Sequence, residues 1–332
     1  MDYITSKAAL IMASLSFCTL ASASTEWQLI YNEDFDGNAL DRSIWHNEVN
    51  CYGGGNNELQ CYTDGNHNVF VDDGHLIIEA RQESFSGPAH FDDSPEYDPR
   101  DQSVTRDYTS ARIRTKHALD IQYGRVEVRA KLPQGQGLWP AIWMLPTENR
   151  YGGWPHSGEI DIMEVVNLNS EGAENLVYGT LHYGDTWPNN SYSHTKSGIA
   201  PAPWANFHEY AIEWEQSEIR WYIDGEHYAT QRPATADQDG WFTYPIENGQ
   251  TLEATSANGM PFNHPFHLIL NVAVGGDWPG DVGSETTFPQ QMMIDYVRVY
   301  RCDGANERGE GCAGLKNEVD THIPLSGNPL PE

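Results

Sequence analysis

Apolar and polar residues alternate over short segments along much of this chain, as they do in half-buried β-strands. Residues 124–132 alternate most clearly, because their apolar residues share one face: Val126, Val128, Ala130 and Leu132. Residues 292–300 alternate in the same way, whereas residues 266–274 are largely apolar and predict a buried strand. Residues 208–231 predict a meander, with a hairpin turn at Asp224-Gly225.

The spacing of these segments predicts an all-β fold. No long amphipathic helix stands out, and Gly, Pro and Asn recur between the short strands. Many short strands with frequent turns are typical of a sandwich or a barrel. Two polar stretches, 84–106 and 234–262, are expected to be loops and not separate domains. Since no internal repeat stands out, we expect one domain.

One predicted strand, within residues 158–167, carries three carboxylates. Glu159 and Asp161 lie two positions apart and share a strand face, but Glu164 would point to the other face of a regular strand. One extra residue at Ile162-Met163 would return Glu164 to the face of Glu159. We therefore predict a β-bulge at this position.

Three acids on one face favour acid–base chemistry. Like charges at close range cannot all ionise easily, so at least one pKa must rise. The result would be one ionised carboxylate and one protonated acid, which is the pair that a retaining glycosidase needs. The spacing alone is weak evidence, because an acid-x-acid-x-x-acid match is expected about once by chance in so acidic a chain.

Residues 1–23 are predicted to be a secretory signal peptide. Lys7 precedes a mainly apolar run, and Ala21-Ser22-Ala23 fits the small-residue cleavage pattern. No later run is long and apolar enough to span a bilayer. We expect a secreted protein, either extracellular or periplasmic.

Cysteine usage agrees with export. Removal of the leader leaves Cys51, Cys61, Cys302 and Cys312, an even number that predicts two disulfides. Three pairings can be drawn, of which the two short loops, Cys51–Cys61 and Cys302–Cys312, are the simplest. Four reduced thiols are the alternative.

Net charge restricts the partners. The chain has 48 acidic and 19 basic residues, for a formal charge of −29. Nucleic acid and anionic membrane surfaces are polyanions, so neither is expected to bind. Most of these acids are expected to form a solvated surface.

The residues around the acids closely resemble the laminarinase-like branch of glycoside hydrolase family 16. The resemblance is carried first by WPAIWMLPTENRYGGWPHSGEIDIMEVVN, residues 139–167. Other segments agree in the order of the family: NNELQCYT at 56–63, YTSARIRT at 108–115, GRVEVRAKLP at 124–133, GTLHYG at 179–184, LNVAVGGDWPG at 270–280 and IDYVRVY at 294–300.

The resemblance implies a β-sandwich jelly roll of two curved antiparallel sheets with a concave substrate cleft. It implies that residues 24–312 are the catalytic domain, leaving 313–332 as a polar C-terminal tail. The expected activity is hydrolysis of internal β-1,3 bonds in laminarin-type β-glucan, with mixed β-1,3/1,4-glucan as a further substrate, by a monomer without a catalytic cofactor. The alternatives are a related galactan hydrolase, either agarase or carrageenase, and a non-catalytic β-glucan-binding protein. Binding proteins on this fold lack the acids, which are present here.

Roles for the acids also follow from the resemblance. Glu159 would be the nucleophile, Glu164 the general acid/base, and Asp161 would tune Glu159. Matching positions for substrate contacts are Asn57, Arg112, Trp139, Trp143, Trp154, His182 and Trp278. Each of these side chains could instead be structural, since Trp is often core and Arg is often a surface residue. Asp277 departs from the family pattern, in which Asn is usual before Trp278.

A structural calcium ion is a further expectation from the resemblance. The matching positions lie far from the acids, on the convex side: Glu33, a carbonyl at Gly74, and Asp295. Oxygen ligands suit this hard cation. The alternative is that Asp295 forms a surface ion pair.

Overall fold

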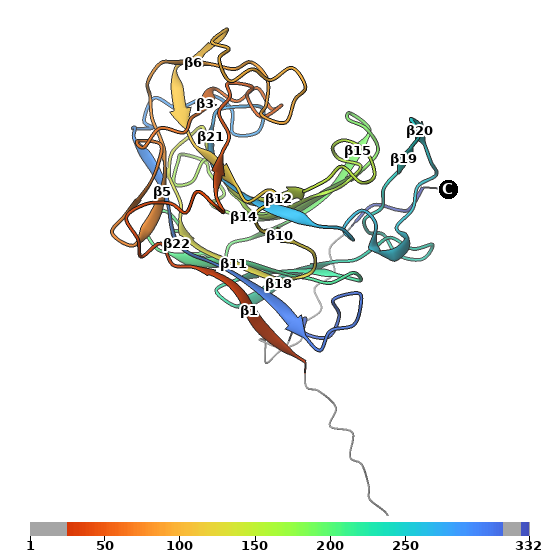
Figure 1. The fold of residues 1–332 in the computed structure, drawn as a ribbon. Coiled ribbons are helices and arrows are strands. Elements are labelled where there is room, and N and C mark those ends of the chain that lie inside the picture. The colour runs from red at the N-terminus through yellow and green to blue at the C-terminus, as the bar shows by residue number, and fades with distance from the viewer. Residues whose placement is uncertain (1–24, 315–326, 332) are drawn as a thin grey trace, which may run out of the picture.

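Two large antiparallel sheets pack face to face in the computed structural model, which describes residues 25–314 and 327–331 (Figure 1). The predicted signal peptide lies outside the described residues. The predicted all-β jelly roll is confirmed, because each large sheet has eight strands and a short 3-10 turn (Ala257–Gly259) is the one helical element among the described residues.

The sheet on the outer, convex side has β22 and β11 at its centre. Its strands, in spatial order, are β18 (Glu226–Gln231), β17 (Ile219–Ile223), β16 (His208–Trp214), β11 (Gly124–Lys131), β22 (Gln290–Asp303), β5 (His75–Ala80) and β4 (Val69–Asp72), with β1 (Glu26–Glu33) also pairing with β22.

The second sheet curves so that β15 lies at one rim and the loops around β3 and β6 lie at the other (Figure 1). Its strands, in spatial order, are β15 (Asn190–Ser197), β14 (Val177–Gly184), β13 (Glu159–Glu164), β12 (Leu138–Pro146), β21 (Phe266–Val274), β9 (Arg112–Arg114) and β2 (His46–Asn47), with β10 (Asp120–Ile121) pairing with β21. We call its outer side the concave face.

Short ribbons complete the structure. They are β3 (Gln60–Tyr62) with β8 (Tyr108–Ser110), β6 (Phe85–Gly87) with β7 (Val104–Arg106), and β19 (Ile246–Glu247) with β20 (Gln250–Thr251). The stretches 84–106 and 234–262 are thus loops with small ribbons inside them, as expected.

The core lies between the two large sheets. The predicted inward face of β11 is buried, and so is nearly the whole of β21. Trp214 and Trp221 of the convex sheet fill the layer, with almost no exposed surface. Burial of such large apolar side chains provides the main stabilisation, about 25 cal/mol for each Å² removed from water.

The outer face of β11 differs from a solvated strand face. Arg125 and Glu127 are buried, although they alternate with the core residues. The segment after β22 packs beside them: the Gly314 N–H donates to Glu213, and three further N–H groups, from 311 to 313, donate to Glu215. We call this segment the flap; it contacts Glu213, which is an ion-pair partner of Arg125.

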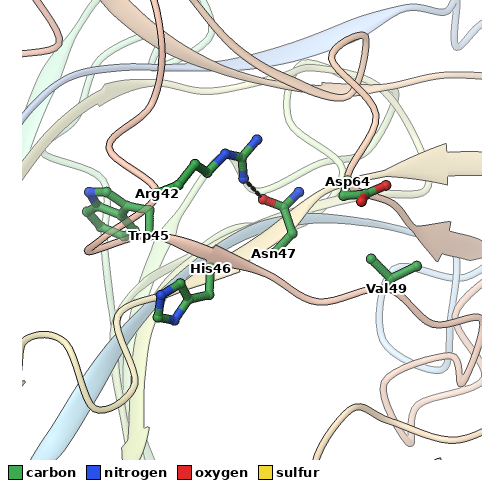
Figure 2. Close-up of a pocket in the computed structure, with 6 residues that line it drawn as sticks. All are labelled: Arg42, Trp45, His46, Asn47, Val49 and Asp64. Atoms are coloured by element: carbon green, nitrogen blue, oxygen red, sulfur yellow. Dashed lines mark hydrogen bonds between the residues drawn. The ribbon is translucent and has the colours of Figure 1, made fainter. Parts of the chain in front are cut away.

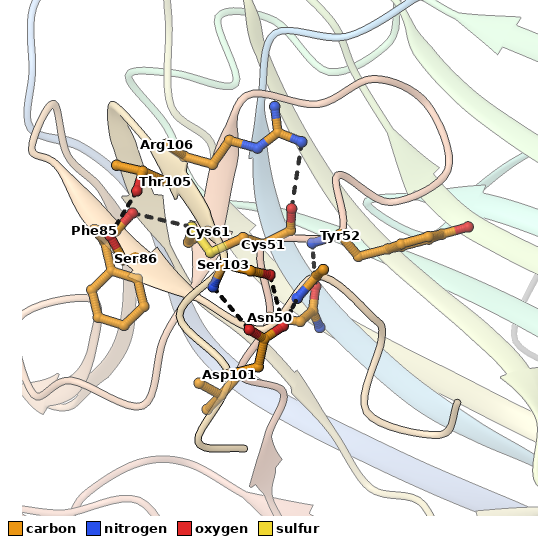
Figure 3. The surroundings of a disulfide bond; sticks show 12 residues. Asn50, Cys51, Tyr52, Cys61, Phe85, Ser86, Asp101, Ser103, Thr105 and Arg106 are labelled. Atoms are coloured by element: carbon orange, nitrogen blue, oxygen red, sulfur yellow. Dashed lines mark hydrogen bonds between the residues drawn. A yellow bond between two sulfur atoms is a disulfide. The ribbon is translucent and has the colours of Figure 1, made fainter. Parts of the chain in front are cut away.

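Both short-loop disulfides are present. Cys51–Cys61 ties the loop before β3, next to the β6–β7 ribbon (Figure 3), and Cys302–Cys312 closes the flap. The end of the chain also packs on the domain, because Asn328 bridges to Gly240 and donates to the Tyr183 hydroxyl. No helix among residues 25–314 and 327–331 is long and apolar enough to cross a membrane.

Candidate active site

The predicted bulge is present in β13. Glu164 pairs with Ala141 of β12 and Asp161 pairs with Trp143, so three steps on β13 match two on its neighbour. The pairing of β13 with β14 shows the same extra residue between Asp161 and Glu164. Because Ile162 and Met163 are both buried in the core, the three acids lie on the concave face.

The convex sheet holds the bulge from behind. The Trp221 indole N–H donates to the backbone carbonyl of Asp161 at 2.9 Å. Gly179 on β14 gives the indole room, since a Cβ there would lie 2.5 Å from it. The acids are therefore carried by a strand whose irregular point is anchored in the core.

Each acid has a different set of neighbours. Glu159 accepts the Trp154 indole N–H at 2.8 Å, and Glu164 accepts the Trp139 indole N–H at 2.9 Å. Nε2 of His182 lies 3.5 Å from both Glu159 Oε1 and Asp161 Oδ2. In the described part of the chain, none of the three acids forms an ion pair with Lys or Arg.

Burial raises the pKa of all three acids, and repulsion from neighbouring acids adds to the rise for Asp161 and Glu164. Burial raises the pKa of Glu159 to about 7, partly opposed by the Trp154 hydrogen bond and by the charge of Arg112. Burial also raises the pKa of Glu164 to about 7; the charge of His182 and the Trp139 hydrogen bond oppose this rise, and the charge of Glu159 adds to it. Asp161 is raised well above its usual pKa by burial and by both neighbouring acids. The cluster can therefore hold protons near neutral pH.

Of the predicted substrate contacts, Trp139, Trp154, His182 and Trp278 lie around the acids. Trp154 and Trp278 are 44% and 41% exposed, and the Trp139 and Trp278 rings meet edge to face at 5.2 Å. The Trp154 and His182 rings are 5.8 Å apart. These contacts give the acid strand an aromatic surface on both sides.

Arg112 and Trp143 form a second group on the same face, on the β12–β21–β9 side of the acids. The Arg112 guanidinium stacks 4.6 Å above the Trp143 ring and lies 3.2 Å from Glu48. Asn57 stands at the loop side of the face and donates to Asp277 at 3.0 Å. Asp277, where the family usually has Asn, therefore accepts a hydrogen bond from Asn57.

Several polar and aromatic residues of this face were not predicted. Asn271 accepts the Trp143 indole N–H at 2.7 Å and donates to Tyr62, which in turn donates to Glu58. Tyr178 lies edge to face with Trp278. Side chains in 270–280 and 179–184 alternate between the two faces of a strand. This alternation could have placed Asn271 on the sheet face that carries Trp143.

The predicted calcium residues lie on the convex sheet, away from the acids. Asp295 is bound by Arg129, with His75 at 3.9 Å, and Glu33 accepts the Phe35 N–H at 3.0 Å. Gly74 turns the chain between β4 and β5. Since Arg129 already neutralises Asp295, these residues fit a calcium ion only if Arg129 moves away.

A pocket of about 430 Å³ lies near β2, at the end of the concave sheet (Figure 2). Its lining is mostly polar: Arg42, Trp45, His46, Asn47, Val49 and Asp64. None of the three acids lines it, and β9, β21 and β12 separate β2 from β13. The candidate active site is therefore on the open sheet face and not in this pocket.

Comparison with known proteins agrees with this geometry. The sequence model described as "Glycosyl hydrolases family 16" matches residues 55–298. The chain is 38% identical over 311 residues to a "Beta-glucanase" of Rhodothermus marinus, covering 89% of this chain and 94% of that protein. It is also 38% identical to "Glucan endo-1,3-beta-glucosidase A1" of Niallia circulans over 82% of this chain, which spans 38% of that longer protein.

A solved structure supports the same assignment. The laminarinase from Rhodothermus marinus superposes with a TM-score of 0.63 at 38% identity, covering 84% of this chain and 98% of that one. The family match spans the acid strand, its bulge and the surrounding tryptophans. The protein is therefore a glycoside hydrolase and belongs to glycoside hydrolase family 16.

Proposed function

We propose that this protein cleaves internal β-1,3 bonds of β-glucan with retention of configuration. Glu159 is the nucleophile and Glu164 is the general acid/base. The observation that carries the proposal is the bulge in β13, which brings three acids onto one aromatic-lined face without an Arg or Lys ion-pair partner in the described chain.

The neighbours of the two glutamates support this order of roles. The Trp154 N–H and the charge of Arg112 both favour the ionised form of Glu159. Glu164 has neighbours of both kinds: the charge of His182 and the Trp139 N–H lower its pKa, whereas the charges of Glu159 and Glu58 raise it and favour its protonated form. An ionised nucleophile beside a protonated acid is the ground state that retention requires.

The reaction then needs two steps. Glu159 attacks the anomeric carbon while Glu164 gives its proton to the departing glycosidic oxygen, and a glycosyl-enzyme forms. Glu164 next removes a proton from water, which displaces Glu159 from the same anomeric carbon. The two carboxyl groups should be roughly 5–5.5 Å apart, the separation for retention.

Asp161 acts through Glu159. It is buried between the two glutamates in the strand, and repulsion from both raises its pKa well above the usual range. A protonated Asp161 would relieve repulsion of ionised Glu159. Asp161→Asn, which keeps the shape, should lower the rate without moving the cleavage site.

The aromatic surface supplies sugar binding. Pyranose C–H faces stack on indole rings, and the exposed rings of Trp154 and Trp278 flank the acids. Arg112 and Asn57 add hydrogen-bond donors for hydroxyl groups on the loop side of the face.

The substrate class rests on two supports. Met163 belongs to the form of the motif with an extra residue between Asp161 and Glu164, and the relatives of this chain are named β-glucanase and endo-1,3-β-glucosidase. A product profile on laminarin, curdlan, mixed-linkage glucan, agarose and carrageenan tests the proposal. Early release of oligosaccharides from laminarin is expected, whereas activity confined to agarose or carrageenan, or binding without cleavage, would overturn it.

The remaining parts of the proposal concern the protein as a whole. The two disulfides support export by residues 1–23, and a site built from one chain supports action as a monomer.

A structural calcium ion at Asp295 would have to displace Arg129. If the ion binds, free calcium should raise the melting temperature relative to a chelator, and unchanged melting would remove this part.

A further inference from the structure

Three potential metal ligands converge at the centre of the concave face. They are one carboxylate oxygen each from Glu159 and Asp161 and one ring nitrogen of His182, and all three ligand atoms lie within 4.8 Å of one another. His182 Nε2 is 3.5 Å from each of the two oxygens. The three side chains come from adjacent strands, because Glu159 of β13 pairs directly with His182 of β14.

This spacing suits a tetrahedral transition metal. Zinc lies about 2.0–2.2 Å from nitrogen and carboxylate oxygen, so two tetrahedral ligands are roughly 3.3–3.5 Å apart. Both distances from His182 Nε2 already match this spacing at 3.5 Å, and the two carboxylate oxygens, which lie within 4.8 Å of each other, need only to draw together to close around one ion. Three protein ligands would leave a fourth position for water, as in open zinc sites.

A second observation points into the same space. Asp161 is only 2% exposed, yet its Oδ2 atom has no hydrogen-bond partner among the described residues. A buried carboxylate oxygen without a donor is costly, so a ligand that supplies positive charge there is favoured. Glu159 keeps its Oε1 atom on this side, because its Oε2 atom accepts the Trp154 N–H.

We propose that Glu159, Asp161 and His182 form an inhibitory site for zinc-like divalent cations. Zn²⁺ and Cu²⁺ are the chemical class, since imidazole with carboxylates favours them over Mg²⁺ and Ca²⁺. The bound ion holds Glu159 and lies where substrate must approach, so it competes with glucan. This competition rests on the proposed function, whereas the metal site itself does not.

The site binds metal reversibly and does not hold a permanently bound ion. Ligating histidines normally donate their other ring N–H to an acceptor, which fixes the ring and strengthens binding. Nδ1 of His182 is buried without such a partner among the described residues. Chelation should therefore remove the ion and restore activity completely.

Binding is tested by calorimetric titration of the full chain with ZnCl₂. The wild type is expected to show one site that His182→Gln weakens about 100-fold or more and that Asp161→Asn also weakens. His67→Gln is the matched control, because His67 is a half-exposed surface histidine that pairs with Glu83. Its affinity should equal that of the wild type, and equal Zn²⁺ binding in His182→Gln would overturn the proposal.

Location is tested in crystals of the wild type soaked with ZnCl₂, which needs no variant to fold. An anomalous peak at the zinc edge between Glu159, Asp161 and His182 is expected. Zinc bound only elsewhere would overturn the site.

Inhibition separates this proposal from the proposed function. Zn²⁺ should raise the apparent KM for laminarin and leave kcat unchanged, with full recovery in EDTA. An enzyme that binds zinc here but cleaves no β-glucan would refute the function and leave the site. Laminarin hydrolysis that is insensitive to saturating Zn²⁺ would refute inhibition while the function stands.

Discussion

The two faces of the sandwich each bury a cluster of acids, and the clusters differ in how the charge is compensated. On the convex face, Arg125 lies among Glu127, Glu209 and Glu213, with nitrogen–oxygen distances of 2.6, 3.3 and 3.1 Å. The hydroxyls of Tyr222 and Tyr296 donate to the same acids. Arg125 is 2% exposed and Glu213 is fully buried, whereas the Glu209 side chain is 22% exposed.

On the concave face, Asp161 and Glu164 are buried and the Glu159 side chain is 14% exposed, and none of the three forms an ion pair with Arg or Lys in the described chain. Two indole N–H groups and His182 are their nearest polar partners. Their pKa values rise because burial disfavours the charged form, and the charges of Arg112 near Glu159 and of His182 near Glu164 oppose this rise only in part.

The difference separates structural acids from reactive ones. A buried acid with a bound arginine holds its charge and fixes the packing around it. A buried acid among other acids is destabilised, and it can exchange a proton or attack a carbon when substrate arrives. The first cluster should therefore control stability, and the second should control activity.

The largest expected effect is on activity, from Glu159→Gln. The substitution keeps the shape but removes the attacking oxygen, so kcat on laminarin should fall by at least about 10³-fold. The melting temperature at pH 7 should stay the same or rise, since one repelling charge is lost. A Glu159→Gln variant with substantial hydrolysis would contradict the role of Glu159.

Glu164→Gln should have a smaller effect that depends on the substrate. Loss of a general acid costs about 10²–10⁴-fold on glucan. Aryl glycosides with good leaving groups need less protonation, so their glycosylation rate should fall far less. Steady-state and burst kinetics on the two substrates make the comparison, and an equal loss on both would remove the acid role.

Arg125→Met should show the opposite pattern to the active-site variants. It leaves the acids of the convex cluster facing one another without their cation, which costs roughly 3–5 kcal/mol in the free energy of unfolding. Activity for each folded molecule should be unchanged. Lys131→Met, at a half-buried position on the same face of β11, is the control and should cost much less in urea titration.

The smallest expected effect is a pH dependence of stability. The folded pKa of Glu159, about 7, lies above the value near 4.3 of an unfolded carboxyl. Between these values the native state binds more protons than the unfolded state, so its stability falls as pH rises. Glu159→Gln removes this loss. Its advantage over the wild type should be absent at pH 4 and grow to about 1–3 kcal/mol by pH 8, whereas a constant or shrinking advantage would contradict the raised pKa.

The central strands of both sheets and the acid strand were predictable from the sequence, because local patterns determine them. The alternation in residues 124–132 and the apolar run of 266–274 gave the central strands of the two sheets. The spacing of Glu159, Asp161 and Glu164 required a bulge if all three were to meet, and the bulge is present.

The convex cluster was not predictable in the same way. Arg125 and Glu127 resemble an ordinary outer strand face, since no local pattern shows that they are buried or that the segment near Gly314 binds Glu213 of their cluster. The Trp221 hydrogen bond to the bulge likewise joins residues 60 positions apart. Such contacts depend on the packing of distant segments, which single-strand periodicity does not contain.

The most direct test of the account is the configuration of the first product. Proton NMR of laminarin hydrolysis, recorded before mutarotation, should show the β-anomer first, because Glu159 and water attack the anomeric carbon in turn from opposite sides. The α-anomer appearing first would show a single inversion by water, and it would contradict the assignment of Glu159 as the nucleophile.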